Sequence, residues 1–297
     1  MQPDLKGVRV AVLGGDAREI ELVSTLSRLG AHVQVVGLPV KNDPPHVKLC
    51  QSLEEGLTGV QAVILPVPGI LENGHIYAVY EEKPLILTEA LLVKLPPEAP
   101  IIAGFARPRL KEIVKRSNVR LVTVLDLDEV AILNSIPSAE GAIQMAMENT
   151  AITIHGSRSF VLGFGRTGAS IARLLHGMGA KVTVVSRTPA HRARAYEMCM
   201  NSISFEELPD AVPEADIIFN TVPAMVLTNC ILSKAREDTV IIDVASPPGG
   251  TDFEAAARLG IKALLAPGLP GKVAPKTAGQ ILSRVIPKLV AQELGMK

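Results

Sequence analysis

The feature that most constrains the fold is a regular alternation of short, β-branched apolar runs with segments of helical periodicity. Each run is nearly all apolar, as expected for parallel strands that helices cover on both faces. Right-handed crossovers join such strands. We therefore predict an α/β protein with two doubly wound parallel sheets, whose strands lie near 8–13, 32–36, 62–65, 100–103 and 119–124, and then near 159–163, 181–185, 216–219, 239–242 and 261–264.

Composition narrows the class of protein. The 297 residues suffice for two ordinary domains, and the 47% hydrophobic content indicates a well-cored, soluble globular chain. Thirty basic and thirty acidic side chains balance, and Trp is absent, which argues against nucleic-acid and membrane-surface partners. The cysteines and histidines show no metal-ligand spacing. With no apolar signal segment before residues 8–13, we expect a cytoplasmic protein without a metal centre.

The clearest motif follows the first strand of the second set. Gly163, Gly165 and Gly168 form a G-x-G-x-x-G pattern between a strand and an amphipathic helix. In dinucleotide-binding domains these glycines permit the tight turn, the approach of the pyrophosphate and the close packing of the helix on the strand. Arg166 and Thr167 fall in the first helical turn, where the amides attract an anion. We predict a dinucleotide site; the alternative is a tight turn without a ligand.

The residues at the end of the next strand predict whether the coenzyme carries a phosphate on the 2′ oxygen of its adenosine ribose. That corner, about twenty residues after the glycines, usually carries an acidic residue that binds the adenosine ribose. Here it carries Ser186, Arg187 and Thr188. Two hydroxyls and a permanently charged guanidinium suit a phosphate on the 2′ oxygen. We therefore predict NADP; the alternative is a solvated Arg187 and NAD.

Other loops after strands point to the same site. Thr221, Val222 and Pro223 follow the strand near 216–219, and Ala245 follows the strand near 239–242. Gly- and Pro-rich loops of this kind fix the backbone without bulky side chains, which suits close approach to a flat nicotinamide ring. We add these residues to the predicted coenzyme site.

The first strand of the chain ends in a related but altered turn. Gly14 and Gly15 are followed by Asp16 where the second motif glycine belongs. Asp16 and Glu19 have the spacing of a capping box. Arg18 places a cation at the carboxyl end of a strand, where open α/β sheets bind ligands. We predict that Gly14, Gly15 and Arg18 bind a substrate carboxylate; a solvated arginine is the alternative.

Two helices frame the second set of strands. Ser135 before Pro137 is typical of a helix start, and we place the beginning of an interdomain helix there. Thr277 and Gln280 have the spacing of a capping box at the start of the last helix, and Lys276 comes just before it.

These motifs together resemble the family of the dipicolinate synthase A subunit, over residues 7 to about 290. The segments that carry the resemblance are Gly-Gly-Asp-Ala-Arg18, Asn134-Ser-Ile-Pro137, Ile154-His-Gly-Ser157, Leu162-Gly-Phe-Gly-Arg-Thr-Gly168, Pro-Gly-Gly-Thr-Asp252, Leu264-Leu-Ala-Pro-Gly-Leu-Pro-Gly271 and Val273-Ala-Pro-Lys-Thr-Ala-Gly-Gln-Ile-Leu282.

The resemblance implies a formate/glycerate dehydrogenase-like fold. A flavodoxin-like substrate domain would span residues 1–136, with the helix at 277–297 returning to it, and a Rossmann NADP-binding domain would span 137–276. It also implies a sporulation enzyme that, with the flavoprotein-like dipicolinate synthase B subunit, oxidises a dihydrodipicolinate-type compound to pyridine-2,6-dicarboxylate.

That chemistry requires two carboxylates to be held while a hydride and a proton leave. Arg18 and Lys276 are candidates for binding the carboxylates; the alternative for Lys276 is an ordinary surface lysine. Ser138 and Glu140 are candidates for contact with the substrate or for taking the proton. A first-turn Glu140 would also simply suit the helix dipole. Alternative functions are an NADP-dependent dehydrogenase of another hydroxy or amino acid, and a non-catalytic NADP-sensing subunit. We also expect homo-oligomers.

Overall fold

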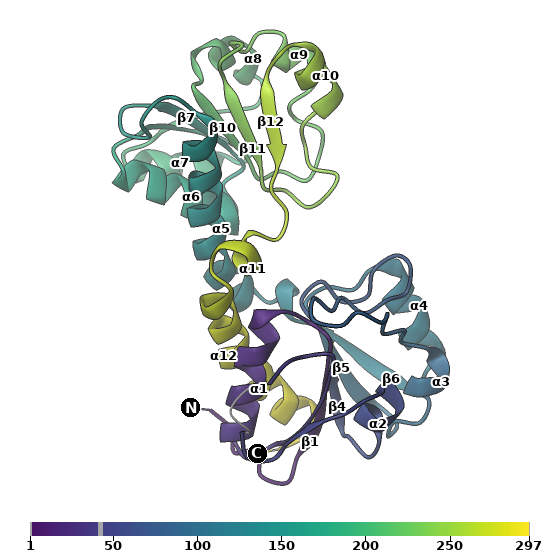
Figure 1. The fold of residues 1–297 in the computed structure, drawn as a ribbon. Coiled ribbons are helices and arrows are strands. Elements are labelled where there is room, and N and C mark those ends of the chain that lie inside the picture. Colours follow the sequence, from purple (N-terminus) through teal and green to yellow (C-terminus); the bar gives the residue numbers. More distant parts are fainter. Residues whose placement is uncertain (1, 41–43, 297) are drawn as a thin grey trace. The chain divides into compact units, whose positions relative to one another are not determined.

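The computed structural model describes residues 2–40 and 44–296 and divides into two compact units, each built on one sheet (Figure 1). The first unit comprises the chain up to Ala131 and from Pro275 onward, and the second comprises Ile132–Ala274. The predicted domain ranges have their outer ends at residues 1 and 297, which lie outside the described residues.

The first unit contains a six-stranded, wholly parallel sheet in the order β3-β2-β1-β4-β5-β6. Strands β2 and β3 are added on one side of β1, and strands β4 to β6 on the other, as in a doubly wound sheet. The strands are β1 (Arg9–Leu13), β2 (His32–Val36), β3 (Val47–Leu49), β4 (Ala62–Ile64), β5 (Ala99–Ala103) and β6 (Val119–Thr123).

Helices pack on this sheet and close its core. They are α1 (Ala17–Arg28), α2 (Leu53–Leu57), α3 (Glu89–Leu92), α4 (Pro108–Arg116) and α12 (Pro275–Glu293), with a 3₁₀ turn at Val124–Asp126. The last helix, α12, lies beside α1 (Figure 1). Glycine at position 279 permits the close contact between these two helices, because a Cβ added there would lie 2.8 Å from the Arg18 carbonyl oxygen.

The second unit repeats the plan with the order β12-β11-β10-β7-β8-β9, again all parallel. Its switch point lies between β7 and β10. The strands are β7 (Arg158–Leu162), β8 (Lys181–Val185), β9 (Asn201–Ile203), β10 (Ile217–Asn220), β11 (Val240–Asp243) and β12 (Lys262–Leu265).

The covering segments of this unit are mostly short. They are α6 (Arg166–Gly177), α7 (Pro189–Glu197), α8 (Leu208–Ala211), a 3₁₀ turn at Val212–Glu214, α9 (Asn229–Leu232), α10 (Phe253–Arg258) and α11 (Leu269–Val273). A long helix, α5 (Asp128–Asn149), leads into the unit from the first one. Buried side chains fill both faces of the sheet, and Phe219 on the central strand β10 is fully buried. The prediction of two doubly wound parallel sheets is confirmed.

Every predicted strand is present, but the edge strands β3 and β9 were missed. Each has three residues, Val-Lys-Leu and Asn-Ser-Ile, and each carries exposed positions. Edge strands are covered less completely than central ones, so they need no continuous apolar run. The apolar pattern that located the central strands was therefore absent.

The predicted start of the interdomain helix is wrong. α5 begins at Asp128 and contains Pro137 in its interior. The acidic first turn, with Asp128 and Glu129, suits the positive end of the helix dipole. Near the proline, Ser135 donates to the Ile132 carbonyl (2.6 Å) and Ser138 to the Asn134 carbonyl (2.8 Å). Both hydroxyls bond carbonyls of their own helix, three and four residues back.

The last helix also starts earlier than predicted. α12 begins at Pro275, where proline suits the first helical position. Thr277 therefore lies in the first turn and is not an N-cap, so the predicted capping box with Gln280 is wrong. Lys276 is likewise part of the helix. No helix within the described residues is long and apolar enough to cross a membrane.

Candidate functional site

The glycine turn between β7 and α6 has little room for any side chain. Gly163 has φ +87°, and an added Cβ would lie 2.5 Å from the Thr221 hydroxyl oxygen. At Gly168, an added Cβ would lie 2.1 Å from the Gly163 carbonyl oxygen. At Gly165, the N-cap of α6, an added Cβ meets nothing within 4 Å. The turn thus packs tightly on the protein side and is open on the other, as a pyrophosphate site requires.

The predicted coenzyme residues gather around one cavity of about 700 Å³. Its size falls within the usual range for small-molecule sites. The exception is Gly168, which lies beneath the turn at the contact between helix and strand. The predicted residues that line the cavity are Gly163, Gly165, Arg166, Thr167, Ser186, Arg187, Thr188, Thr221, Val222, Pro223 and Ala245.

The corner after β8 presents a cation to this cavity. Arg187 is exposed and has no hydrogen bond or ion pair with any described residue. Ser186 is buried, and its hydroxyl oxygen accepts a hydrogen bond from the Thr188 amide (3.3 Å). Arg192 donates to the Ser186 carbonyl (2.7 Å), which fixes the corner from the following helix. Arg187 is therefore the guanidinium left for a ligand at this corner.

Sequence reasoning missed several residues of the cavity, of which His191 is the most informative. His191 Nδ1 lies 3.3 Å from the Ser186 hydroxyl, and its ring meets that of Phe164 edge-on at 6.1 Å. It belongs to the first turn of α7, which points back to the end of β8. A helix start predicted at Thr188-Pro189 would have placed His191 in the first turn of that helix, near the cavity. The other missed lining residues are Phe164, Phe205, Ala224, Val226, Val244 and Ser246.

At the corner after β1, in the first unit, the amides of the two predicted glycines already have partners. Gly14 has φ +64° and Gly15 has φ +121°. The Gly14 amide donates to the Val36 carbonyl and the Gly15 amide to the Tyr77 carbonyl, both at 2.8 Å. The two glycine amides are thus used inside the protein. A carboxylate at this corner would have to be recognised by Arg18 without them.

Arg18 lies in a buried ionic cluster. Only 7% of the residue is exposed, so the alternative of a solvated arginine is wrong. Its Nε and Nη2 donate to the two carboxylate oxygens of Asp16, at 2.9 and 2.8 Å. Burial acts to raise the pKa of Asp16, but these hydrogen bonds and the charge of Arg18 hold that pKa below its ordinary value. The Nη1 atom of Arg18 has no hydrogen bond with the described residues.

Glu19 completes the cluster. Its Oε2 accepts from the Asp16 amide (2.8 Å), which forms the predicted capping box, and its Oε1 accepts from the Val67 amide (3.1 Å). Burial raises the pKa of Glu19 from the ordinary 4.5 to about 7, against the opposing charge of Arg18 and those two hydrogen bonds. The corner therefore contains a carboxyl that changes charge near neutral pH.

This carboxyl predicts a pH-dependent stability. Because the folded state raises the pKa of Glu19, folding favours its protonated form. The gain is complete below pH 4.5 and is lost as the pH rises through 7. We expect the free energy of unfolding, from urea titrations, to fall by about 3 kcal/mol between pH 5 and pH 8. The lowered pKa of Asp16 adds a constant stabilisation across this window, which is lost only as the pH falls below about 4.

Glu19→Gln should flatten that pH profile, whereas Glu112→Gln on the exposed surface of α4 should leave it as in the wild type. Equal slopes for the wild type and Glu19→Gln would contradict a raised pKa at this site.

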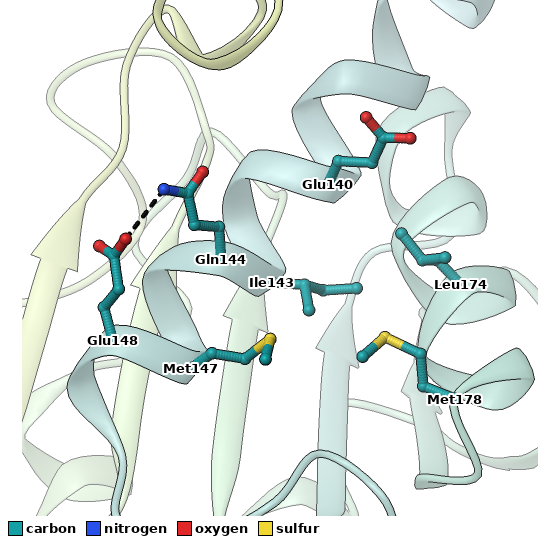
Figure 2. A pocket seen from close by; sticks show the side chains of 7 residues that line it. All are labelled: Glu140, Ile143, Gln144, Met147, Glu148, Leu174 and Met178. Carbon is teal, nitrogen blue, oxygen red and sulfur yellow. Dashed lines mark hydrogen bonds between the residues drawn. The ribbon is translucent and has the colours of Figure 1, made fainter.

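The predicted catalytic residue Glu140 lies on a different surface of the second unit. It lines a cavity of about 470 Å³ between α5 and α6 together with Leu174 and Met178, and Figure 2 shows Ile143 between Glu140 and Met178. In the same view Gln144 donates to Glu148 (2.8 Å). This cavity shares no lining residue with the coenzyme cavity. Glu140 also lies deep in α5, so the first-turn alternative is wrong.

The remaining predicted residues are placed as follows. The Ser138 hydroxyl is half-buried and donates to a carbonyl of its own helix, as described above. Lys276 is exposed in the first turn of α12. Neither lines the coenzyme cavity, and their roles stay predictions.

Comparisons with known proteins match the two units to two different domain families. Residues 9–125 match the N-terminal domain of the dipicolinate synthase A subunit, and residues 136–245 match the NAD-binding domain of D-isomer specific 2-hydroxyacid dehydrogenases. The dipicolinate synthase A subunit of Bacillus subtilis (strain 168) is 40% identical over 301 residues, which cover 97% of each chain. The chain belongs to the family of the dipicolinate synthase A subunit.

Solved structures show the same relation. The crystal structure of the dipicolinate synthase A subunit from Bacillus halodurans is 41% identical, with a TM-score of 0.93 over 97% of this chain and 99% of that one. The apo structure of D-lactate dehydrogenase from Escherichia coli, at 15% identity and a TM-score of 0.64 over 98% of both chains, shares the fold. As a member of this family, the chain is an oxidoreductase subunit with a domain that binds a nicotinamide coenzyme.

Proposed function

We propose that this chain uses NADP to oxidise a dihydrodipicolinate-type compound to dipicolinate in the cytoplasm of sporulating cells, together with the dipicolinate synthase B subunit. The observation that carries the proposal is the 40% identity to a dipicolinate synthase A subunit over 97% of both chains. The choice of NADP rests on Arg187, the cation without a partner among the described residues at the corner where the adenosine ribose is expected.

The residues of the second unit fit the coenzyme. Amides at the start of α6 and the open side of Gly165 suit the pyrophosphate. The hydroxyls of Ser186 and Thr188 and the guanidinium of Arg187 suit a 2′-phosphate. When bound, the coenzyme supplies the hydride acceptor. The Phe, Val, Ala and Pro side chains that line the cavity would keep water from the flat ring of a bound coenzyme.

The first unit supplies the carboxylate-binding group. Arg18 is held by Asp16 through Nε and Nη2, which leaves Nη1 to bind one carboxylate of the substrate. When Glu19 is protonated, Arg18 and Asp16 sum to zero charge, and when it is ionised the cluster carries one negative charge. A dicarboxylate should therefore bind better below the pKa of Glu19. Lys276 is the proposed partner of the second carboxylate. Glu140 lines a cavity that shares no residue with the coenzyme cavity, so it is not assigned the proton.

The test is a direct oxidation assay. The purified chain is mixed with NADP and a freshly generated dihydrodipicolinate-type compound, with and without the B subunit, and absorbance follows NADPH and the aromatic product. We expect the two products in equal amounts.

Other outcomes separate the alternatives. Turnover of a 2-hydroxy acid with none of the dihydro compound would favour a different dehydrogenase, as the match of residues 136–245 allows. Tight NADPH binding without turnover in either arm would favour a sensing role.

A further inference from the structure

A fully buried carboxylate lies at the end of β11, beneath the coenzyme cavity. Asp243 is 0% exposed. Its Oδ2 accepts hydrogen bonds from Asn220 Nδ2 (3.0 Å), the Gly250 amide (2.9 Å) and the Thr251 hydroxyl (2.6 Å). Its Oδ1 accepts one from the Ala245 amide (3.1 Å). An acceptor with this many donors is suited to be an anion.

These bonds tie together the two loops that wall one end of the cavity. Asn220, also fully buried, donates to the Val222 carbonyl (3.1 Å) and accepts from the Val222 amide (3.0 Å). Through Asn220, Asp243 therefore fixes the loop at 221–224. Through Ala245 and Gly250, it fixes the loop at 244–250. Residues of both loops line the cavity.

The charge of Asp243 has no counterion among the described residues. Every donor to it is a neutral amide or hydroxyl, and it takes part in no ion pair within the part of the chain that the structure describes. A buried carboxylate without a cation is costly, and buried acidic groups are seldom found unpaired. A binding site that places a positive charge nearby would offset that cost.

The topology places such a charge at this end. The corner for the adenosine ribose follows β8, on one side of the switch point between β7 and β10. A dinucleotide bound across the switch point would direct its nicotinamide half toward the ends of β10 and β11. The nicotinamide ring is cationic when oxidised and neutral when reduced.

We propose that the buried charge of Asp243 makes this cavity select the oxidised over the reduced form of its nicotinamide coenzyme. Asp243 does not line the cavity, so it is a positioning residue that also acts through its field. The proposal is independent of the 2′-phosphate, because it concerns the other end of the coenzyme. It holds for NADP or NAD, whichever binds.

The test measures the dissociation constants of the oxidised and reduced coenzyme in the wild type, Asp243→Asn and Thr251→Val. Calorimetry and the fluorescence of NADPH or NADH give these constants. Asp243→Asn keeps the shape and removes the charge. Thr251→Val removes one donor to the same carboxylate and keeps the charge. We expect Asp243→Asn to shift the ratio of the two constants about tenfold against the oxidised form, and Thr251→Val to change both constants by one common factor.

An unchanged ratio in folded Asp243→Asn, or the same shift in ratio in Thr251→Val, would overturn the proposal. If circular dichroism shows that Asp243→Asn does not fold, the wild type decides. It must then bind the oxidised coenzyme more tightly than the reduced one, and the reverse order overturns the proposal. A preference for NAD would refute the proposed coenzyme while leaving this result standing.

Discussion

Gly168→Ala should abolish coenzyme binding and lower the free energy of unfolding by about 3 kcal/mol. The added methyl carbon would lie 2.1 Å from the Gly163 carbonyl oxygen, which is backbone and cannot rotate away. Helix α6 must therefore move off the turn, and its N-terminal amides move with it. Calorimetric titration with coenzyme and urea denaturation measure the two effects.

Gly177→Ala in the same helix is the matched control. An added Cβ there meets nothing within 4 Å. Alanine should leave coenzyme binding unchanged and raise stability by about 0.5 kcal/mol, because it restricts the unfolded chain more than glycine does. Wild-type affinity in Gly168→Ala would show that the turn does not hold the coenzyme.

Arg18→Met should lower the free energy of unfolding by about 3–5 kcal/mol, an effect similar to that of Gly168→Ala. It removes the cation of a pair whose side chains are 8% and 15% exposed, and leaves Asp16 close to Glu19 without compensation. The proposed function adds a second expectation, which is the loss of measurable dipicolinate binding. The double variant Asp16→Asn/Arg18→Met should recover part of the stability and none of the binding.

Arg109→Met on α4 provides the comparison. Arg109 pairs with Glu112 at 3.0 Å, but both side chains are close to half exposed, and such pairs contribute less than about 1 kcal/mol. If Arg18→Met destabilises no more than Arg109→Met, the buried cluster does not contribute as described. If it unfolds readily yet still binds dipicolinate, Arg18 is structural only.

The fold could be predicted because its central strands are covered on both faces. Runs such as those in β1 and β7 are therefore mostly apolar, and the glycine spacing after β7 is dictated by contacts between backbone atoms. Residues fixed by such local rules, such as Gly163, were found from the sequence. The polar edge strands β3 and β9 obey no such rule and were missed.

The parts that failed depend on contacts distant in the chain. A proline usually starts a helix, but α5 continues through Pro137, and the Ser135 hydroxyl there lies 2.6 Å from the Ser170 hydroxyl of α6. Nothing local indicated that the Gly15 amide is taken by Tyr77. The bonds from Gly250 and Thr251 to Asp243 likewise join residues several positions apart around a turn.

The claim on which the account depends is that Arg187 recognises a 2′-phosphate. The most direct measurement is the ratio of NAD to NADP dissociation constants in the wild type, Arg187→Ala and Arg194→Ala. Arg194 is the control, since it lies on α7, pairs with Glu197 (3.0 Å) and does not line the cavity. We expect the wild type to prefer NADP, and Arg187→Ala to lose roughly ten- to a hundredfold of that preference, the effect of one charge-assisted contact. NAD affinity should stay constant and Arg194→Ala should match the wild type. A wild type that prefers NAD, or an Arg187→Ala variant with an unchanged ratio, would contradict the account.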